Sequence, residues 1–300
     1  MEKQALQQSL AKAYFLAARP KTWIASLSPV FIGTALGAQN GKIDLLIFSL
    51  TLLFSFLIQV GTNFANDYFD FVKGTDSILR KGPKRATQEG WISPRSMLLA
   101  SFIIFASAFV IATPLMFLAG LWSVAVATLC IVLGVLYTGG PRPLGYLGLG
   151  EVLVLVFFGC IPVCGAYFLQ THSLNWLVFT ASLAPGLLSC SILIANNLRD
   201  EISDRAADKR TLIVRWGNRF GSWEYTLSIV FASLIPWILV LFQGAKMGVV
   251  CASAILPLSI PAVQKTFRFR DPLELIPVLQ TSALLLFLYT ALFCAGALLW

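Results

Sequence analysis

Charged residues are scarce in this 300-residue chain. Asp, Glu, Lys and Arg together make up 12% of it, whereas hydrophobic residues make up 57%. Soluble globular domains carry about 25% charged residues, so the composition excludes an ordinary soluble domain. We predict an all-α, polytopic membrane protein that has the lipid bilayer as its surroundings.

Side chains that commonly hold zinc are also few. His172 is the only histidine, and we expect it at the membrane side opposite the acidic stretches described below, which argues against a catalytic role. The six cysteines lie in apolar segments, without the paired spacing and partner ligands of a zinc site. Thiols in such surroundings are usually inert. We interpret the cysteines as small apolar side chains.

The N-terminal region lacks a short apolar core that ends in a small-residue cleavage site, so we expect no cleaved signal peptide. Residues 1–19 instead carry Leu6, Leu10, Tyr14 and Phe15 at helical spacing, with basic residues among them. This pattern is typical of an amphipathic segment that lies on the membrane surface.

Nine apolar segments are long enough, or nearly so, for a bilayer that needs about 20 residues per crossing. The positions of the basic residues test the number of spans, because Lys and Arg are enriched in cytoplasmic loops. With nine crossings, 20 of the 22 basic residues fall on one side and only Lys42 and Lys246 on the other. We therefore expect a cytoplasmic N-terminus, and the net charge of +8 needs no nucleic acid as its explanation. The predicted spans are residues 22–39, 43–72, 96–118, 121–138, 149–170, 175–199, 220–243, 247–264 and 275–299.

The second predicted span ends in amides and carboxylates. Asn63, Asn66, Asp67, Asp70 and Lys73 follow one another at steps that place them on a single helix face. A long apolar segment has no need of such a face unless it holds a charged partner. We interpret this stretch as one half of a polar site.

The sixth span ends in a second polar face about 130 residues later. Asn197, Asp200, Asp204 and Asp208 share a face by the same spacing. Both faces are expected on the cytoplasmic side, where they could form one shared site.

The similarity of the two stretches indicates a rough internal repeat, because each polar face is followed by a basic loop. A duplicated four-helix unit with one added helix would produce it. We expect a single integral-membrane domain over residues 1–300, with a surface segment at 1–19 and repeat halves at roughly 20–140 and 149–270.

Carboxylates at membrane depth are costly, on the order of 2.5 to 3.5 kcal/mol each on insertion scales, so a cluster of them requires a compensating partner. Magnesium is such a partner, since it favours one or two carboxylates and completes its coordination with phosphate and water. The Lys and Arg residues that follow or interrupt both faces suit phosphate. The pattern predicts a magnesium and diphosphate site. Alternatively, single basic residues are topology signals and the acids solvate the helix ends.

A third stretch, residues 137–146, is too rich in Gly and Pro to be helical. Arg142 is the only basic residue of this loop. It either reaches the polar site or belongs to a tight connection between two helices.

The combined motifs resemble the UbiA superfamily of intramembrane aromatic prenyltransferases over nearly the whole chain. Asn-Asp-x-x-Asp closes the second of nine spans, and Asp-x-x-x-Asp closes the sixth. Residues 18–22, 66–76, 137–141 and 208–212 are similar to the 1,4-dihydroxy-2-naphthoate polyprenyltransferase branch. The superfamily's third acid usually follows the second by four residues, but here, as in that branch, position 74 is Gly and the next acid is Asp76.

This resemblance implies transfer of a polyprenyl group from polyprenyl diphosphate to 1,4-dihydroxy-2-naphthoate, with decarboxylation, in menaquinone biosynthesis. It implies an enzyme of the bacterial inner membrane that uses Mg²⁺, as two ions bridging the acidic faces to the diphosphate. The implied catalytic residues are Asp67, Asp70, Asp200 and Asp204, and these together with Asp76 are the implied metal ligands. The implied substrate-binding residues are Asn63, Asn66, Lys73, Tyr137, Arg142, Asn197, Lys209 and Arg210.

Other functions stay open from the residues alone. A UbiA-type prenyltransferase could act on another acceptor, because the acceptor pocket is not legible in the sequence. An ion-coupled transporter would also place acids in the membrane, but the repeats of transporters often have opposite topology. An intramembrane phosphatidyl-type transferase would carry one Asp-rich run with the pattern Asp-Gly-x-x-Ala-Arg, which this chain lacks.

Overall fold

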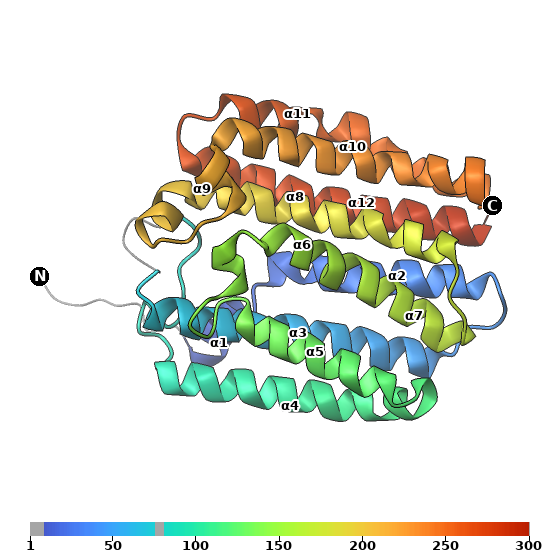
Figure 1. The fold of residues 1–300 in the computed structure, drawn as a ribbon, viewed down its shortest axis with the longest axis horizontal. Helices are drawn as coiled ribbons and strands as arrows, with labels where there is room; N and C mark the ends of the chain where they lie inside the picture. The colour runs from blue at the N-terminus through green and yellow to red at the C-terminus, as the bar shows by residue number, and fades with distance from the viewer. Residues whose placement is uncertain (1–8, 76–80, 300) are drawn as a thin grey trace, which may run out of the picture.

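The structure is a computed structural model that describes residues 9–75 and 81–299. Every regular element in these residues is helical (Figure 1), which confirms the all-α prediction. Seven of the helices described there are long and apolar enough to cross a membrane. The helical elements are α1 (Leu10–Ala17), η1 (Pro20–Thr22), α2 (Trp23–Ala38), α3 (Leu45–Val72), α4 (Pro94–Ala119), α5 (Trp122–Leu136), η2 (Leu144–Leu147), α6 (Gly150–Leu155), η3 (Val156–Cys160), α7 (Ile161–Thr171), α8 (Trp176–Ala206), α9 (Leu212–Trp216), α10 (Asn218–Gln243), η4 (Met247–Ala254), α11 (Ile255–Arg268), η5 (Pro272–Leu275) and α12 (Ile276–Leu299).

The nine predicted spans all appear as helices. Seven of them correspond to the long apolar helices, with α6, η3 and α7 continuous as one span and with η4 and η5 leading into α11 and α12. The other two are α2, with 16 residues, and α5, with 15.

Many large apolar side chains point out of the bundle, among them Phe102, Phe117 and Leu241. Such a surface requires lipid around it, so the chain is an integral membrane protein.

Helix α8 occupies the centre of the bundle and is the most buried of the long helices. Its neighbours come very close where residues are small: a Cβ at Gly159 would lie 2.9 Å from the Cα of Gly186 on α8. Small residues at such contacts allow membrane helices to pack tightly. The close contact holds α8 firmly, and α8 carries one of the two acidic faces.

The span that contains α6 and α7 is interrupted by the π-helical turn η3. Pro162 follows this turn at the second position of α7. Because proline has no N–H and its ring crowds the carbonyl four residues earlier, the regular α-helical ladder cannot continue through this point. The turn places Phe157, Phe158 and Cys160 along an internal cavity.

Both acidic stretches lie at the same end of the bundle, where the loop after α3 meets the loop after α8 (Figure 1, left). Lys73 and Gly74 end α3, and Gly74 has the left-handed φ of +70° that commonly ends helices. Helix α8 runs to Ala206, beyond the predicted end at 199, so Asp200 and Asp204 are helical. Inverted transporter halves would place such motifs at opposite ends.

One expectation about the second face was wrong. Asp208 lies beyond the end of α8, with a left-handed φ of 51° and an exposed side chain. It forms an ion pair with Arg210. The helical spacing used for the prediction does not apply to it, because the helix has already ended.

The N-terminal segment forms α1 within residues 10–17, and residues 1–8 lie outside the described part. Ala13 and Ala17 are buried, and the ring of Tyr14 contacts that of Phe64 on α3 at 5.8 Å between centroids. Leu10 and Phe15 are exposed. The helix therefore packs one face against the bundle near the acidic end of α3.

Candidate active site

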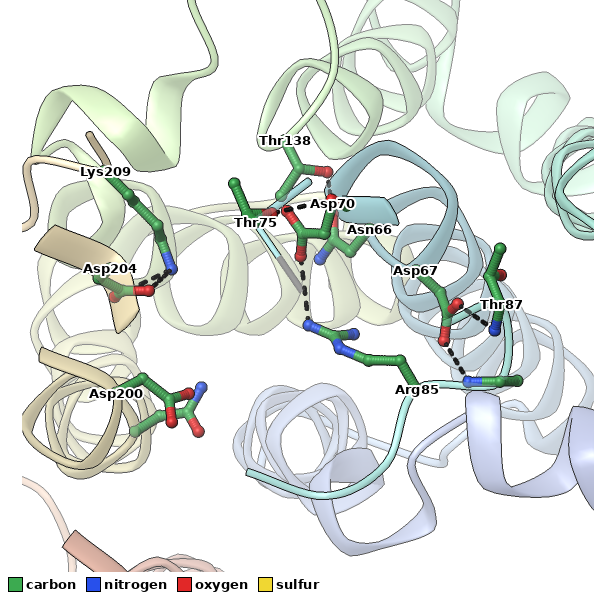
Figure 2. A network of polar contacts seen from close by, with 12 residues as sticks. Asn66, Asp67, Asp70, Thr75, Arg85, Thr87, Thr138, Asp200, Asp204 and Lys209 are labelled. Atoms are coloured by element: carbon green, nitrogen blue, oxygen red, sulfur yellow. Dashed lines mark hydrogen bonds and ion pairs between the residues drawn. The ribbon is translucent and has the colours of Figure 1, made fainter. Parts of the chain in front are cut away.

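Asp67 ties the end of α3 to the loop that follows it. Its carboxylate is buried and accepts hydrogen bonds from the backbone N–H of Ala86, at 3.2 Å, and of Thr87, at 3.0 Å (Figure 2). Hydrogen bonds to an ionised acceptor are among the stronger ones. Asp67 thus fixes this loop over the helix end.

Asp70, one turn later on α3, bridges two loops. Its Oδ2 accepts from the guanidinium of Arg85 at 3.2 Å, and its Oδ1 accepts from the hydroxyl of Tyr146 at 2.9 Å. Arg85 is buried, whereas Lys84 beside it is exposed and pairs with Glu89. The structure therefore places Arg85, rather than Lys84, at the acidic face.

The acids of α8 are paired with cations as well. Arg199 donates to both oxygens of Asp200, at 2.8 and 2.6 Å. Lys209 lies 3.2 Å from Oδ2 and 3.3 Å from Oδ1 of Asp204 (Figure 2). Arg199, Asp200 and Asp204 are all buried.

Tyr146 joins the two acidic faces. Its hydroxyl bonds to Asp70 on the α3 side, and its ring lies 5.3 Å from the ammonium of Lys73 and 5.9 Å from that of Lys209. Ammonium groups are attracted to aromatic faces at such distances. Burial and the charge of Asp70 raise the pKa of Tyr146, so it stays a hydrogen-bond donor.

Carboxylates from both halves of the chain raise the pKa of Lys209. Burial by itself would lower its pKa, but the charges of Asp204, Asp70 and Asp200 outweigh that effect and raise it. The ammonium therefore stays charged, and it lies between the two acidic faces. The charges of both acidic faces therefore act on the same ammonium group.

The three predicted amides bind protein groups. Asn63 donates to the carbonyl of Ala18 at 3.0 Å, and Asn66 accepts from the hydroxyl of Thr138 at 2.7 Å. Asn197 donates to the carboxylate of Glu151 at 3.1 Å. The amides thus join α3 and α8 to neighbouring segments of the site.

Of the remaining predicted residues, some lie at the site and others do not. Lys73 donates to the carbonyls of Thr138, at 2.6 Å, and Gly140, at 2.9 Å, and burial lowers its pKa more than the charge of Asp70 raises it. Arg142 is exposed and makes no hydrogen bond or ion pair with the described residues. Arg210 is exposed and pairs with Asp208, and Asp76 lies outside the described residues. The structure thus brings Lys73 to the site, but not Arg142 or Arg210.

Sequence reasoning missed several members of the site. Arg85 was one of two adjacent loop cations with no basis for a choice between them. Tyr146 lies in the Gly- and Pro-rich loop, where no spacing pattern points to it, and Arg199 is one of several basic residues that interrupt or follow the second acidic face. Glu151 carried a signal that went unused, because an ionisable residue inside an apolar span is itself a pointer to function.

The donor set fits magnesium that arrives with a phosphate ligand. Residues 9–75 and 81–299 contain no group of three or more Asp, Glu, His or Cys side chains that could hold a metal by themselves. Magnesium needs only one or two carboxylates when phosphate and water complete its coordination. Asp204 Oδ2 is buried and accepts no hydrogen bond, although Lys209 lies near it. Such an oxygen is suited to a hard cation.

A cavity of about 530 Å³ begins beside the acidic end of α3 and continues between α2, α3, α5 and α7. Its polar end is lined by Asn63, Asn66 and Tyr137, and most of the remaining lining is apolar. Trp122 and Phe168 also line it, and their rings meet edge to face at 5.2 Å. The cavity therefore runs from the amides of the first polar face into an apolar chamber.

The chain is similar to proteins of known activity over nearly its full length. It is 37% identical to a 1,4-dihydroxy-2-naphthoate octaprenyltransferase of Mycobacterium tuberculosis, with 94% of each chain covered. It is 35% identical to the protein of the same name in Escherichia coli, with 98% of this chain and 97% of that one covered.

A solved structure supports the fold. A UbiA homologue from Archaeoglobus fulgidus, bound to GPP and Mg²⁺, aligns with a TM-score of 0.60 and 16% identity, covering 94% of this chain and 99% of that one. At this identity the likeness concerns the fold. Residues 26–279 also match the UbiA prenyltransferase family, and with the relatives above this establishes that the chain belongs to that family.

Proposed function

We propose that this protein transfers a polyprenyl group from polyprenyl diphosphate to 1,4-dihydroxy-2-naphthoate, with loss of carbon dioxide, to give demethylmenaquinol. The observation that carries the proposal is the meeting of two acidic faces (Figure 2) next to an apolar cavity whose polar end is lined by Asn63 and Asn66 of the first face. This arrangement suits a substrate with a charged head and a long apolar tail. The names of the full-length relatives point to the same acceptor.

The acids of both faces would hold magnesium, which we propose as two ions. Asp70 on α3 and Asp204 on α8 are suited to it because the charges of both act on Lys209, and Asp67, Asp200 and Asp76 complete the proposed set. Bound magnesium would neutralise the diphosphate and so make it a better leaving group.

The cations of the site would bind and orient the diphosphate. Lys209 and Arg85 are paired with carboxylates here, and a competing positive charge on those carboxylates would let both side chains turn to phosphate oxygens. A guanidinium suits phosphate because its donors form a planar fork. Tyr146 keeps its proton and holds Asp70 in place.

The cavity would hold the polyprenyl tail. Along α3, its lining runs from Asn66 to Thr51, which is on the order of 20 Å at the rise of an α-helix. Apolar walls exclude the water that would otherwise quench an allylic cation. The faces of Phe157 and Phe158, which also line the cavity, would stabilise positive charge by roughly 0.5 to 2 kcal/mol each.

The membrane placement follows from the same site. We propose the bacterial inner membrane, with the N-terminus and the acidic end on the cytoplasmic side, because the basic loops gather at that end. The water-soluble naphthoate would then reach the site from the cytoplasm, and the released diphosphate would leave to the cytoplasm.

The deciding experiment is an assay of the purified protein with octaprenyl diphosphate and 1,4-dihydroxy-2-naphthoate, with and without magnesium. Diphosphate release and the prenylated product, identified by mass spectrometry, should both require magnesium. Diphosphate binding without any product from this acceptor would overturn the choice of acceptor. Failure to bind diphosphate would overturn the proposed reaction itself.

A further inference from the structure

Glu151 is an acid inside a membrane-crossing span that the proposed reaction has not yet used. It lies in the first turn of α6 and is half-buried. Its Oε1 accepts a hydrogen bond from Asn197 at 3.1 Å. A carboxylate at this depth is costly unless it serves a partner.

Glu151 has neighbours in both the acidic site and the cavity, namely Asn197 on α8 and the cavity-lining Tyr137. Asn197 precedes Asp200 on α8 by about one helical turn, so the contact with Glu151 is one turn deeper in the membrane than the acidic faces. Tyr137 lines the cavity, and its hydroxyl lies 3.2 Å from where a Cβ on Gly150 would stand. The start of α6 therefore borders the polar end of the cavity.

Tyr137 and Lys209, which lie near Glu151, cannot act as bases, so Glu151 is the group that can accept a proton. A phenol keeps its proton at neutral pH, so Tyr137 is a donor and not a base. Lys209 remains an ammonium. Behind Glu151, the thiol of Cys190 donates to its backbone carbonyl at 3.2 Å, and Glu224 on α10 is the other acid within electrostatic reach.

We propose that Glu151, held by Asn197, binds a hydroxyl of the aromatic acceptor and accepts its proton during prenyl transfer. The inference rests on the proposed function and adds to it the place and orientation of the acceptor. The acceptor would lie between Glu151 and the head of the prenyl tail, with Tyr137 beside it. Its ring would then face the allylic carbon from the cavity side, opposite the diphosphate.

The acceptor's O–H proton passes to the Glu151 carboxylate, and the oxygen's electron pair moves through the ring to form the bond between the carboxylate-bearing ring carbon and the allylic carbon. The allylic C–O bond breaks, and its electron pair leaves with the diphosphate. The ring carboxylate then departs as carbon dioxide, its bonding pair restores the aromatic ring, and the oxygen regains the proton from Glu151.

The test is Glu151→Gln in the full-length protein, assayed with octaprenyl diphosphate and 1,4-dihydroxy-2-naphthoate. Gln keeps the shape and can still accept the hydrogen bond from Asn197, but it is not a base. We expect kcat/KM for the acceptor to fall by about 10²- to 10⁴-fold, while KM for the diphosphate stays within about twofold. Glu274→Gln is the control, a half-buried glutamate on η5 that pairs with Lys265, and it should retain activity.

A pH series separates a base from a purely structural residue. At saturating diphosphate and magnesium, the rate of Glu151→Gln should rise with pH as the acceptor hydroxyl ionises in solution, and an acceptor with a more acidic hydroxyl should be rescued more strongly. Glu151→Asp should keep the pH profile of the unchanged protein at a lower rate. Wild-type activity and an unchanged profile in Glu151→Gln would overturn the inference, and so would equal losses for both substrates. If the unchanged protein forms no product, the proposed function fails instead.

Discussion

The guanidinium of Arg85 lies 3.2 Å from the carboxylate of Asp70, so a loop residue covers the acidic end of the helix that precedes it. Asp67 holds the same loop through the backbone N–H groups of Ala86 and Thr87. The first acidic motif therefore has two roles. One carboxylate fixes the loop, and the other holds a loop cation at the site.

Replacing Arg85 by Gln should weaken the use of the diphosphate substrate. The change removes the positive charge next to Asp70 and the fork that would bind phosphate, so we expect kcat/KM for the diphosphate to fall by about 10- to 100-fold. Arg95→Gln is the matched control, because Arg95 is exposed on α4. Steady-state kinetics that give the same values for both variants would contradict the role of Arg85.

Replacing Asp67 or Asp200 by Asn should abolish turnover while the protein stays in the membrane. At Asp67 the new NH₂ group would face a backbone N–H donor, which breaks the hold on the loop. At Asp200 the loss of charge leaves Arg199 buried without its carboxylate partner. We expect losses of at least about 100-fold in diphosphate release. Membrane content, measured by immunoblot, should be unchanged, and near-normal activity in either variant would contradict the two-face site.

Replacing Gly165 by Phe should restrict the length of the tail. Gly165 lines the cavity, and a Cβ there would meet nothing within 4 Å, so a ring can enter the chamber without a clash. We expect kcat/KM for octaprenyl diphosphate to fall at least about 10-fold relative to geranyl diphosphate, because only the long tail needs the filled space. Gly165→Ala should behave like the unchanged protein. Equal losses for octaprenyl and geranyl diphosphate would show that the ring disturbs the packing of the helix and does not act by restricting the space for the tail.

Lys209 should contribute to stability across the working pH range. Its pKa is raised above the unfolded value, so its contribution is fully present below the unfolded pKa and is lost only as the pH rises through the still higher folded pKa. Between about pH 6 and pH 9 we therefore expect no change from this group, since an unperturbed lysine titrates near 10.4.

Lys209→Gln tests that contribution directly. The change leaves Asp204 buried without its ammonium partner and should destabilise the protein by about 1 to 2 kcal/mol, less than for a fully buried pair because Lys209 is partly exposed. The apparent melting temperature should fall by a few degrees without magnesium, and magnesium should restore part of the loss. An unchanged melting temperature in the absence of magnesium would contradict the pairing.

The sequence predicts the parts of the site that follow helical spacing, but not the contacts that depend on the path of a loop. The acidic faces of α3 and α8 follow from helical spacing, and their meeting at one end follows from the charge of the loops. The sequence does not show which of Lys84 and Arg85 reaches the acidic face, because both are cations in the same loop. The path of the loop decides it, since Lys84 is exposed and Arg85 is buried. Asp208 shows the opposite error, since a spacing rule was carried past the end of the helix.

The sequence by itself determined the membrane-spanning helices, the two acidic faces and their common side, because hydropathy and helical period are local properties of the chain. Only the tertiary structure decided which cations meet which acids, that Tyr146 joins the two faces, and that Glu151 lies against Asn197. These contacts join segments far apart in the chain. Their geometry depends on helix ends, loop paths and close packing, none of which has a local signature.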